Sequence, residues 1–170
     1  MFLLDYTTPE KAEGAVADVY NIFPKEMGVP ESLQIYSANP KLLELQGEAI
    51  KYYMGQDELS FHLLAAIRFI AANHFCHDYC TMLNASMLKA SGMTEEEVQR
   101  LAEDPTAGFV DEEAALLAFV IKALESPSSI GEGDIAPLRE LGWSDTAIFN
   151  AIGQASQMSA ASLIYRTFKK

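Results

Sequence analysis

Apolar residues recur every three or four positions along most of this chain, and that spacing strongly limits the folds open to it. Leu116, Phe119 and Val120, for example, share one face of a helix. Alternation of apolar and polar residues never runs long, and Val, Ile and Thr do not cluster between turns as they do in strands. The sequence therefore predicts an all-α fold, a bundle of about eight helices, in a single domain over residues 1–170.

Capping residues and turn residues divide the chain into helical segments. Thr94, followed three residues later by Glu97, predicts a capping box at a helix start, and Asp57 can cap another helix. Gly92 is typical of the position just after a helix end. The expected helices cover residues 7–23, 31–38, 40–55, 57–73, 76–92, 94–102, 111–124, 134–141 and 145–170.

Charge and hydropathy exclude several classes of partner. The net charge of −12 argues against binding to nucleic acid or to an anionic membrane, because both require a basic surface. The sequence contains no run of 18 apolar residues, so we expect no membrane-spanning helix. Residues 1–14 lack the basic and long apolar regions of a signal peptide, which predicts a cytoplasmic protein.

Both cysteines and two of the three histidines lie in residues 73–84, NHFCHDYCTMLN. In a reducing compartment, two close cysteines indicate redox or metal chemistry. Cys76 is expected near a helix N-terminus beside His74 and His77, a setting that lowers the pKa of a thiol. Cys80 lies one turn further along and should be more buried. A nucleophilic thiol with a second thiol nearby predicts peroxide reduction, in which the second thiol resolves a sulfenic acid.

The spacing of the two cysteines restricts this interpretation. Helical residues four apart have Cβ atoms about 5–6 Å apart, whereas a disulfide needs about 3.5–4.5 Å. A bridge between Cys76 and Cys80 therefore requires the first helical turn to loosen. A zinc site is the alternative, but one helix cannot aim Cys76, His77 and Cys80 at a single ion, so His74, His62 or another chain would have to contribute. We predict neither a metal nor another cofactor.

Simpler roles are open for several of these residues. Cys80 can be an ordinary core residue, since unpaired cysteine is often buried. Tyr79 can pack in the core or donate a hydrogen bond to the site. His62 is consistent with a helical histidine that has a polar partner. Arg68 is consistent with a solvated surface residue or with a residue that forms an interchain salt bridge. Four apolar residues either belong to the core or line an apolar ligand pocket: Phe75, Met82, Met87 and Phe149.

Four segments resemble those of the carboxymuconolactone decarboxylase superfamily, in its AhpD-like (alkylhydroperoxidase-like) branch. They are YTTPEKAEGAVADVYNIF, LLAAIRFIAANHFCHDYCTMLNASMLKASGMTEEEV, DEEAALLAFVIKAL and LGWSDTAIFNAIGQASQMSAAS. The resemblance implies an all-α bundle that assembles into dimers, trimers or hexamers. The small residues of the last helix suit such a subunit interface. The resemblance also implies a thiol-dependent peroxidase that acts on a small hydroperoxide and has a thiol reductant protein as its partner.

The family's catalytic motif carries over only in part. Tyr79 and Cys80 match its tyrosine and second cysteine, the thiol that attacks peroxide in the family. His77 holds the place of the first cysteine, with Cys76 displaced by one residue, and Asn84 holds the place of the later histidine. The family's upstream glutamate falls at Leu64 or Ala65, neither of which can carry a proton. The resemblance thus favours Cys80 as the attacking thiol, whereas helix position favours Cys76.

Three functions are consistent with these residues. In the first, a thiol peroxidase, Cys76 and Cys80 form the redox pair, His77 is the base, and Glu48 reaches the site from an earlier helix. In the second, a lactone decarboxylase or isomerase, a histidine acts as acid or base while Arg68 holds a carboxylate. In the third, a noncatalytic oligomeric protein binds a small apolar or acidic ligand.

Overall fold

The structure is a computed structural model that describes residues 1–75, 78–104 and 106–170. These residues form nine α-helices and three short 3-10 helices, and they contain no strand beyond an isolated bridge between Phe2 and Lys169. The predicted all-α class of fold is confirmed.

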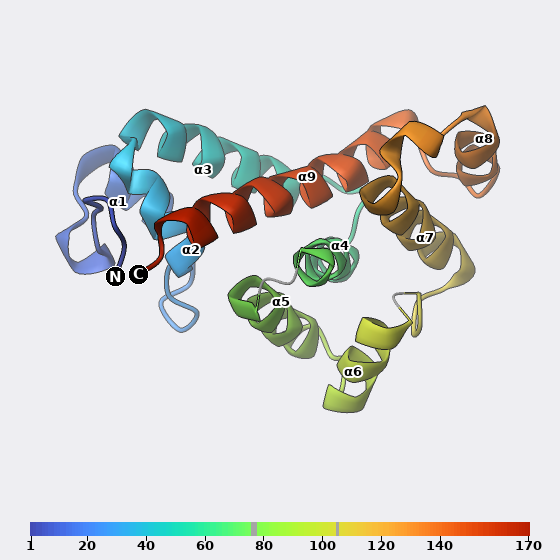
Figure 1. Cartoon of the computed structure of the whole chain (residues 1–170), viewed down its shortest axis with the longest axis horizontal. Coiled ribbons are helices and arrows are strands. Elements are labelled where there is room, and N and C mark those ends of the chain that lie inside the picture. The colour runs from blue at the N-terminus through green and yellow to red at the C-terminus, as the bar shows by residue number, and fades with distance from the viewer. Residues whose placement is uncertain (76–77, 105) are drawn as a thin grey trace. The chain divides into compact units, whose positions relative to one another are not determined.

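The α-helices are separated by short connections along the chain (Figure 1). In order they are α1 (Gly14–Tyr20), α2 (Glu31–Gln34), α3 (Pro40–Gly55), α4 (Phe61–His74), α5 (Asp78–Ala90), α6 (Glu95–Glu103), α7 (Asp111–Glu125), α8 (Glu132–Glu140) and α9 (Asp145–Phe168). The 3-10 helices are η1 (Pro9–Lys11), η2 (Ile35–Ala38) and η3 (Pro127–Ser129).

The helices form two compact units, one of residues 1–56 and 161–170 and the other of residues 57–160. In the first unit α1 packs on α3. The two chain ends also meet there: the backbone N–H of Leu3 donates to the carbonyl of Phe168 at 2.8 Å. The ring of Phe2 packs edge-on against Tyr165, with 5.6 Å between ring centroids. These contacts hold the end of the long helix α9 against the N-terminal segment.

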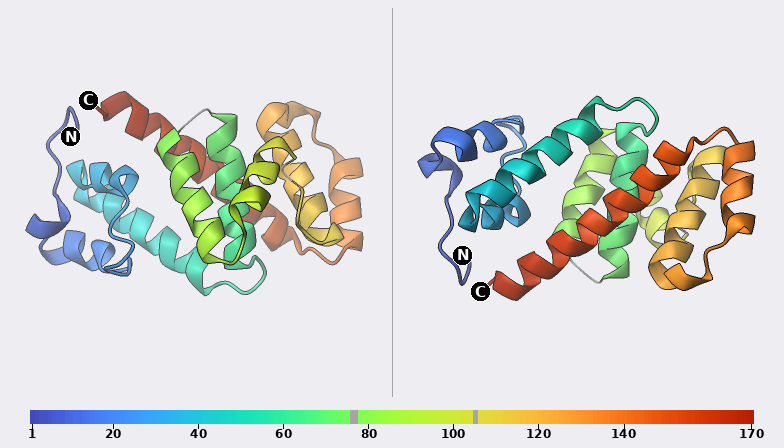
Figure 2. Two further views of the ribbon diagram at one scale, coloured as in Figure 1. Left: turned by 90° about the horizontal axis from the view of Figure 1, so that it is seen from below. Right: turned by 90° about the horizontal axis from the view of Figure 1, so that it is seen from above.

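Helix α4 is the central element of the second unit, and it packs against α5 and α7 (Figure 2). Its residues from Leu63 to Ala72 are all buried except Arg68, which is half-buried. Arg68 is also the only polar residue in that stretch. A helix that is apolar all round belongs in a core, so burial of α4 brings one cationic side chain toward the interior.

Two helix ends show the predicted capping chemistry clearly. The capping box at α6 is confirmed: Thr94 Oγ1 accepts from the N–H of Glu97 at 3.2 Å, and Glu97 Oε2 accepts from the N–H of Thr94 at 2.7 Å. Gly92 has a φ of +111°, as expected for a residue just after a helix end. The capping box satisfies two backbone donors that the helix itself leaves unpaired.

Three predicted helix starts need correction. Ser60, and not Asp57, caps α4, because its Oγ accepts from the N–H of Leu63 at 3.1 Å. The helix expected over residues 7–23 is divided into η1 and α1, since the backbone is extended at the intervening residues and Gly14 has a φ of +54°. Helix α8 begins two residues before the expected Asp134, whose carboxylate accepts from the N–H of Gly131 at 3.0 Å.

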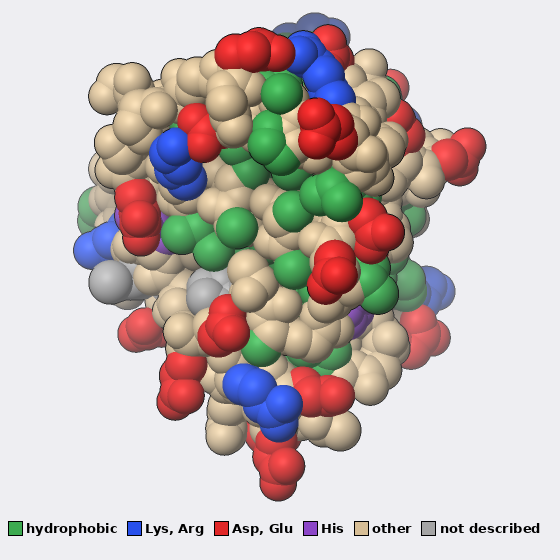
Figure 3. Space-filling view, turned by 90° about the vertical axis from the view of Figure 1, so that its right-hand side faces the viewer, with side chains coloured by type: hydrophobic (Ala, Val, Ile, Leu, Met, Phe, Trp, Pro, Cys, Tyr) green, Lys and Arg blue, Asp and Glu red, His purple; other side chains and the backbone are tan. Residues whose placement is uncertain are grey.

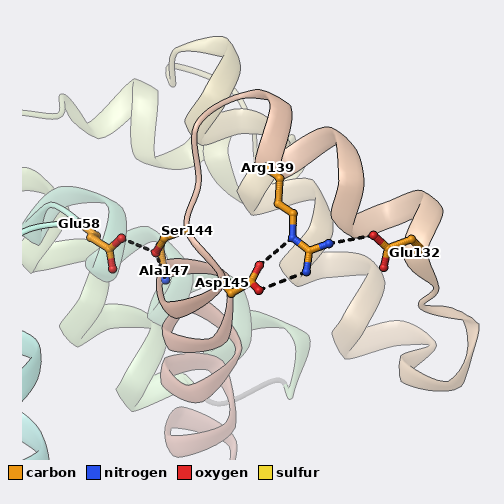
Figure 4. Close-up of polar contacts among 6 residues, drawn as sticks. All are labelled: Glu58, Glu132, Arg139, Ser144, Asp145 and Ala147. Atoms are coloured by element: carbon orange, nitrogen blue, oxygen red, sulfur yellow. Dashed lines mark hydrogen bonds and ion pairs between the residues drawn. The ribbon is translucent and has the colours of Figure 1, made fainter.

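A polar network fixes the corner between α8 and α9 (Figure 4). Ser144 Oγ accepts from the N–H of Ala147 at 3.0 Å, as predicted for a cap, and it donates to Glu58. Arg139 binds Asp145 through two nitrogens, at 2.7 and 3.2 Å, and Glu132 through a third at 2.8 Å. Each nitrogen of this exposed arginine therefore donates to a carboxylate.

The acidic composition shows on the surface. Figure 3 displays one face, on which acidic side chains are widely spread between apolar ones. Within the described ranges, no helix combines the length and apolarity needed to cross a bilayer.

Candidate functional site

The interior face of α5 carries the described cysteine. Cys80, Asn84 and Leu88 follow one another at four-residue spacing, and each is at most 1% exposed. Residues four apart lie on one face of a helix, and α5 packs against α4. Cys80 and Asn84 are therefore neighbours on the side of α5 that faces the core. The predicted burial of Cys80 is confirmed.

Arg68 connects three helices of the second unit. Its Nε donates to Oδ1 of Asn84 in α5 at 3.0 Å, and its Nη1 donates to Oε1 of Gln154 in α9 at 3.0 Å. Its Nη2 approaches Sδ of Met87 at 3.6 Å. The interpretation of Arg68 as a solvated surface residue is wrong, because its guanidinium donates to acceptors of α5 and α9 within the protein.

Removal from water is the main electrostatic influence on Arg68. Desolvation lowers the pKa of its guanidinium to about 10, so the group stays protonated at neutral pH. Its hydrogen-bond acceptors are two amide oxygens and a thioether, all neutral. In the described part of the chain, no ion pair includes Arg68. The site therefore contains a positive charge whose described partners are neutral.

Asn84 links this charge to the cysteine's own helical turn. Its Nδ2 donates to the carbonyl of Cys80 at 2.8 Å while its Oδ1 accepts from Arg68. Both ends of the amide are thus occupied, which fixes its orientation. An amide does not titrate, so Asn84 cannot perform the proton transfer of the histidine whose place it holds in the family pattern. Its role here is to position α5 against Arg68.

The other predicted site residues have differing surroundings. Cys76 and His77 lie outside the described residues, so their roles stay predictions. His74 is exposed at the end of α4, where its ring meets Phe75 edge-on with centroids 4.9 Å apart. Tyr79 is half-buried. Glu48 is exposed on α3 and pairs with Lys51 at 2.9 Å.

The residues with simpler expected roles differ in their burial. Leu64 and Ala65, at the place of the family's glutamate, are buried apolar residues. His62 has a polar partner as expected, with Nδ1 lying 2.7 Å from Ser91 Oγ. Four apolar residues are expected in the core or around a ligand pocket. The core alternative is wrong for three of them, and Met87 is half-buried beside Arg68. The exposed three are Phe75 (39%), Met82 (70%) and Phe149 (76%).

Sequence reasoning missed Gln154. This residue is 5% exposed, lies between buried Ala151 and Ala155 along α9, and also donates through Nε2 to Gln157 at 3.1 Å. The available signal was a long polar side chain among small residues on a helix, and such a side chain needs a partner when it is buried. No group of three or more potential metal ligands occurs among the described histidine, cysteine, aspartate and glutamate residues.

A solved structure shares this fold. The chain is similar to an uncharacterized peroxidase-related protein from Silicibacter sp. TM1040, with a TM-score of 0.83 and 16% sequence identity, over 98% of this chain and 88% of that one. No family model matches the sequence, and no curated protein matches it. At this identity the likeness shows a common fold.

Proposed function

We propose that this protein is a thiol-dependent peroxidase of the alkylhydroperoxidase-like type, with Cys76 and Cys80 as its redox pair. The observation that carries the proposal is the place of Cys80, one helical turn before the residue that binds the Arg68 cation. The similarity to a peroxidase-related structure supports it. The homo-oligomer, the cytoplasmic location and the thiol reductant protein expected from the sequence belong to the same proposal.

The charge of Arg68 would favour the reactive form of the thiol. A thiolate is the nucleophile, and a nearby cation stabilises it relative to the neutral thiol. Because the partners of Arg68 in the described residues are neutral, its charge is not cancelled locally. In the low dielectric of a helix interface such a charge acts over a longer distance than it does in water.

The reaction would consist of two steps before reduction. The attacking thiolate bonds to one peroxide oxygen as the O–O bond breaks, giving a sulfenic acid and an alcohol that takes up a proton. The second thiol then attacks the sulfenic sulfur, forming a disulfide and releasing water. A thiol reductant protein returns both cysteines to the thiol state. We assign the proton transfers to His77, which lies outside the described residues.

Thiol counting by mass spectrometry tests this function. The reduced protein is treated with stoichiometric hydrogen peroxide or an organic hydroperoxide, and free thiols are counted before and after adding a dithiol reductant. We expect rapid loss of both thiols and their full return. In the Cys76→Ser variant hydrogen peroxide should oxidise Cys80 only as far as a sulfenic acid. Because Cys80 is 1% exposed in the folded state, dimedone is added in urea, where it traps this sulfenic acid. The Cys80→Ser variant should resist oxidation. Two thiols that survive excess peroxide would contradict the proposal and favour a noncatalytic binding protein.

A further inference from the structure

Two arginines of the second unit differ in the charge of their partners. Arg139 is exposed and binds the carboxylates of Glu132 and Asp145 (Figure 4). In the described residues the guanidinium of Arg68 donates instead to two side-chain amides and a thioether, and no ion pair includes it. A guanidinium that is removed from water is stabilised more by a carboxylate than by an amide. Stability alone therefore does not account for the neutral partners of Arg68.

The side-chain amide of Gln154 is oriented by contacts at both of its ends. Its Oε1 accepts from Nη1 of Arg68 at 3.0 Å, and its Nε2 donates to Oε1 of Gln157 at 3.1 Å. The reversed amide would set two N–H donors against the guanidinium, which has no acceptor. Gln154 is also 5% exposed, so water does not compete freely for this amide. Its oxygen is therefore kept directed at Arg68.

Arg68 is held from two helices at once. While Gln154 of α9 accepts from Nη1, Oδ1 of Asn84 in α5 accepts from Nε at 3.0 Å. The guanidinium is planar and rigid, so fixing these two nitrogens fixes the direction of the whole group. Asn84 also donates to the carbonyl of Cys80 at 2.8 Å. The positive charge is thereby held beside the helical turn that carries Cys80.

We propose that Gln154 is a positioning residue for the thiol of Cys80: its amide holds the Arg68 guanidinium beside α5 and leaves the positive charge uncancelled. Such a cation favours the thiolate over the thiol, and the low dielectric of a helix interface extends its reach. A carboxylate at the same place would hold the guanidinium equally well but would cancel much of its charge. This inference rests on the proposed thiol function, and it adds a residue of α9 to the thiol site.

The test is Gln154→Glu in the Cys76→Ser protein, where Cys80 is the one remaining thiol. The ultraviolet absorbance of the thiolate is followed against pH, and the same protein with Cys80→Ser supplies the tyrosine baseline. We expect the midpoint of thiolate formation to rise by about one pH unit or more, because the new carboxylate cancels the nearby cation. The melting temperature at pH 7 should rise as well. A merely structural role for Gln154 predicts that a stronger bond to Arg68 leaves the midpoint unchanged.

Two further variants complete the test. Gln157→Glu is the matched control, because it adds the same charge one turn further along α9 and can still accept from Nε2 of Gln154; it should move the midpoint much less. Gln154→Met keeps the length of the side chain, removes the acceptor, and serves if Gln154→Glu does not fold. It should lower the melting temperature and still raise the midpoint, since the guanidinium is no longer held beside α5.

Three results would overturn the positioning role: an unchanged midpoint in Gln154→Glu, an unchanged midpoint in Gln154→Met, or an equal rise in Gln157→Glu. These titrations use no peroxide, so they are independent of the thiol counting that tests the peroxidase. A raised midpoint in a protein whose thiols survive peroxide would support the positioning role and contradict the peroxidase. Rapid loss of both thiols with an unchanged midpoint would support the peroxidase and overturn the positioning role.

Discussion

Nε of Arg68 in α4 donates to Oδ1 of Asn84 in α5 at 3.0 Å, and this bond ties the cysteine-bearing helix to the most buried helix of its unit. The same amide donates to the carbonyl of Cys80 at 2.8 Å. Asn84 thus connects a cation on one helix to the turn that carries the thiol. Because an amide does not titrate, Asn84 acts at this position as a structural link.

Asn84→Ala should therefore destabilise the protein clearly. The substitution removes an acceptor from a half-buried charged group and a donor from the Cys80 carbonyl, for an expected loss of about 1–3 kcal/mol in the free energy of unfolding. Urea denaturation followed by circular dichroism measures this loss. Asn73→Ala, at an exposed position in α4, is the control and should change the value by less than about 0.5 kcal/mol. Equal effects of the two substitutions would contradict the linking role of Asn84.

The helices could be predicted from the sequence because their signals are local. The Thr94 capping box depends on residues three positions apart, and it forms as expected. Ser60 and Asp57 are both good caps within four residues, so composition alone could not choose between them. The bond between Arg68 and Gln154 joins residues 86 positions apart. A single arginine in an apolar helix does not reveal which later helix will cover it, and its setting was therefore predicted incorrectly.

We expect that position 47 requires glycine, because the side chain of Val19 leaves no space there for a Cβ atom. A Cβ added to Gly47 in α3 would lie 2.7 Å from Cγ2 of Val19, a buried side chain of α1. Val is stiff at χ1, so Gly47→Ala should cost about 1–3 kcal/mol through overpacking. In a Val19→Ala background the same change should stabilise by about 0.5–1 kcal/mol, because alanine favours helix more than glycine does. Urea denaturation of the four proteins measures both effects, and a cost of Gly47→Ala that is equal in the two backgrounds would rule out the clash.

Burial predicts slow alkylation of Cys80. Cys80 is 1% exposed. In the Cys76→Ser protein, iodoacetamide should therefore modify this remaining thiol far more slowly in the folded state than in the unfolded state. The rate should rise with urea as the protein opens, because reaction then follows the open population. Mass spectrometry at timed intervals measures the rate. Alkylation that is as fast in buffer as in high urea would show that solvent reaches this thiol in the folded state.

The contact between Glu31 and Lys169 should make stability depend on pH at the acid end. Lys169 and Tyr165 both donate to Oε2 of Glu31, the tyrosine at 2.9 Å. The hydrogen bond from Lys169 holds the pKa of Glu31 below its usual value of 4.5. The folded state then binds fewer protons than the unfolded state, so this contribution is complete above pH 4.5 and is lost as pH falls through the folded pKa.

Glu31→Gln tests this dependence by thermal denaturation at pH 7 and pH 3. At pH 7 the variant should be less stable than the wild type by about 0.2–1 kcal/mol, the range for partly exposed ion pairs. At pH 3 the difference should shrink, because protonation removes the same charge from the wild type. Glu48→Gln, which removes a carboxylate from the exposed pair with Lys51, should have a smaller effect at pH 7. A loss from Glu31→Gln that is equal at both pH values would show that the carboxylate acts by packing, and that its charge contributes nothing.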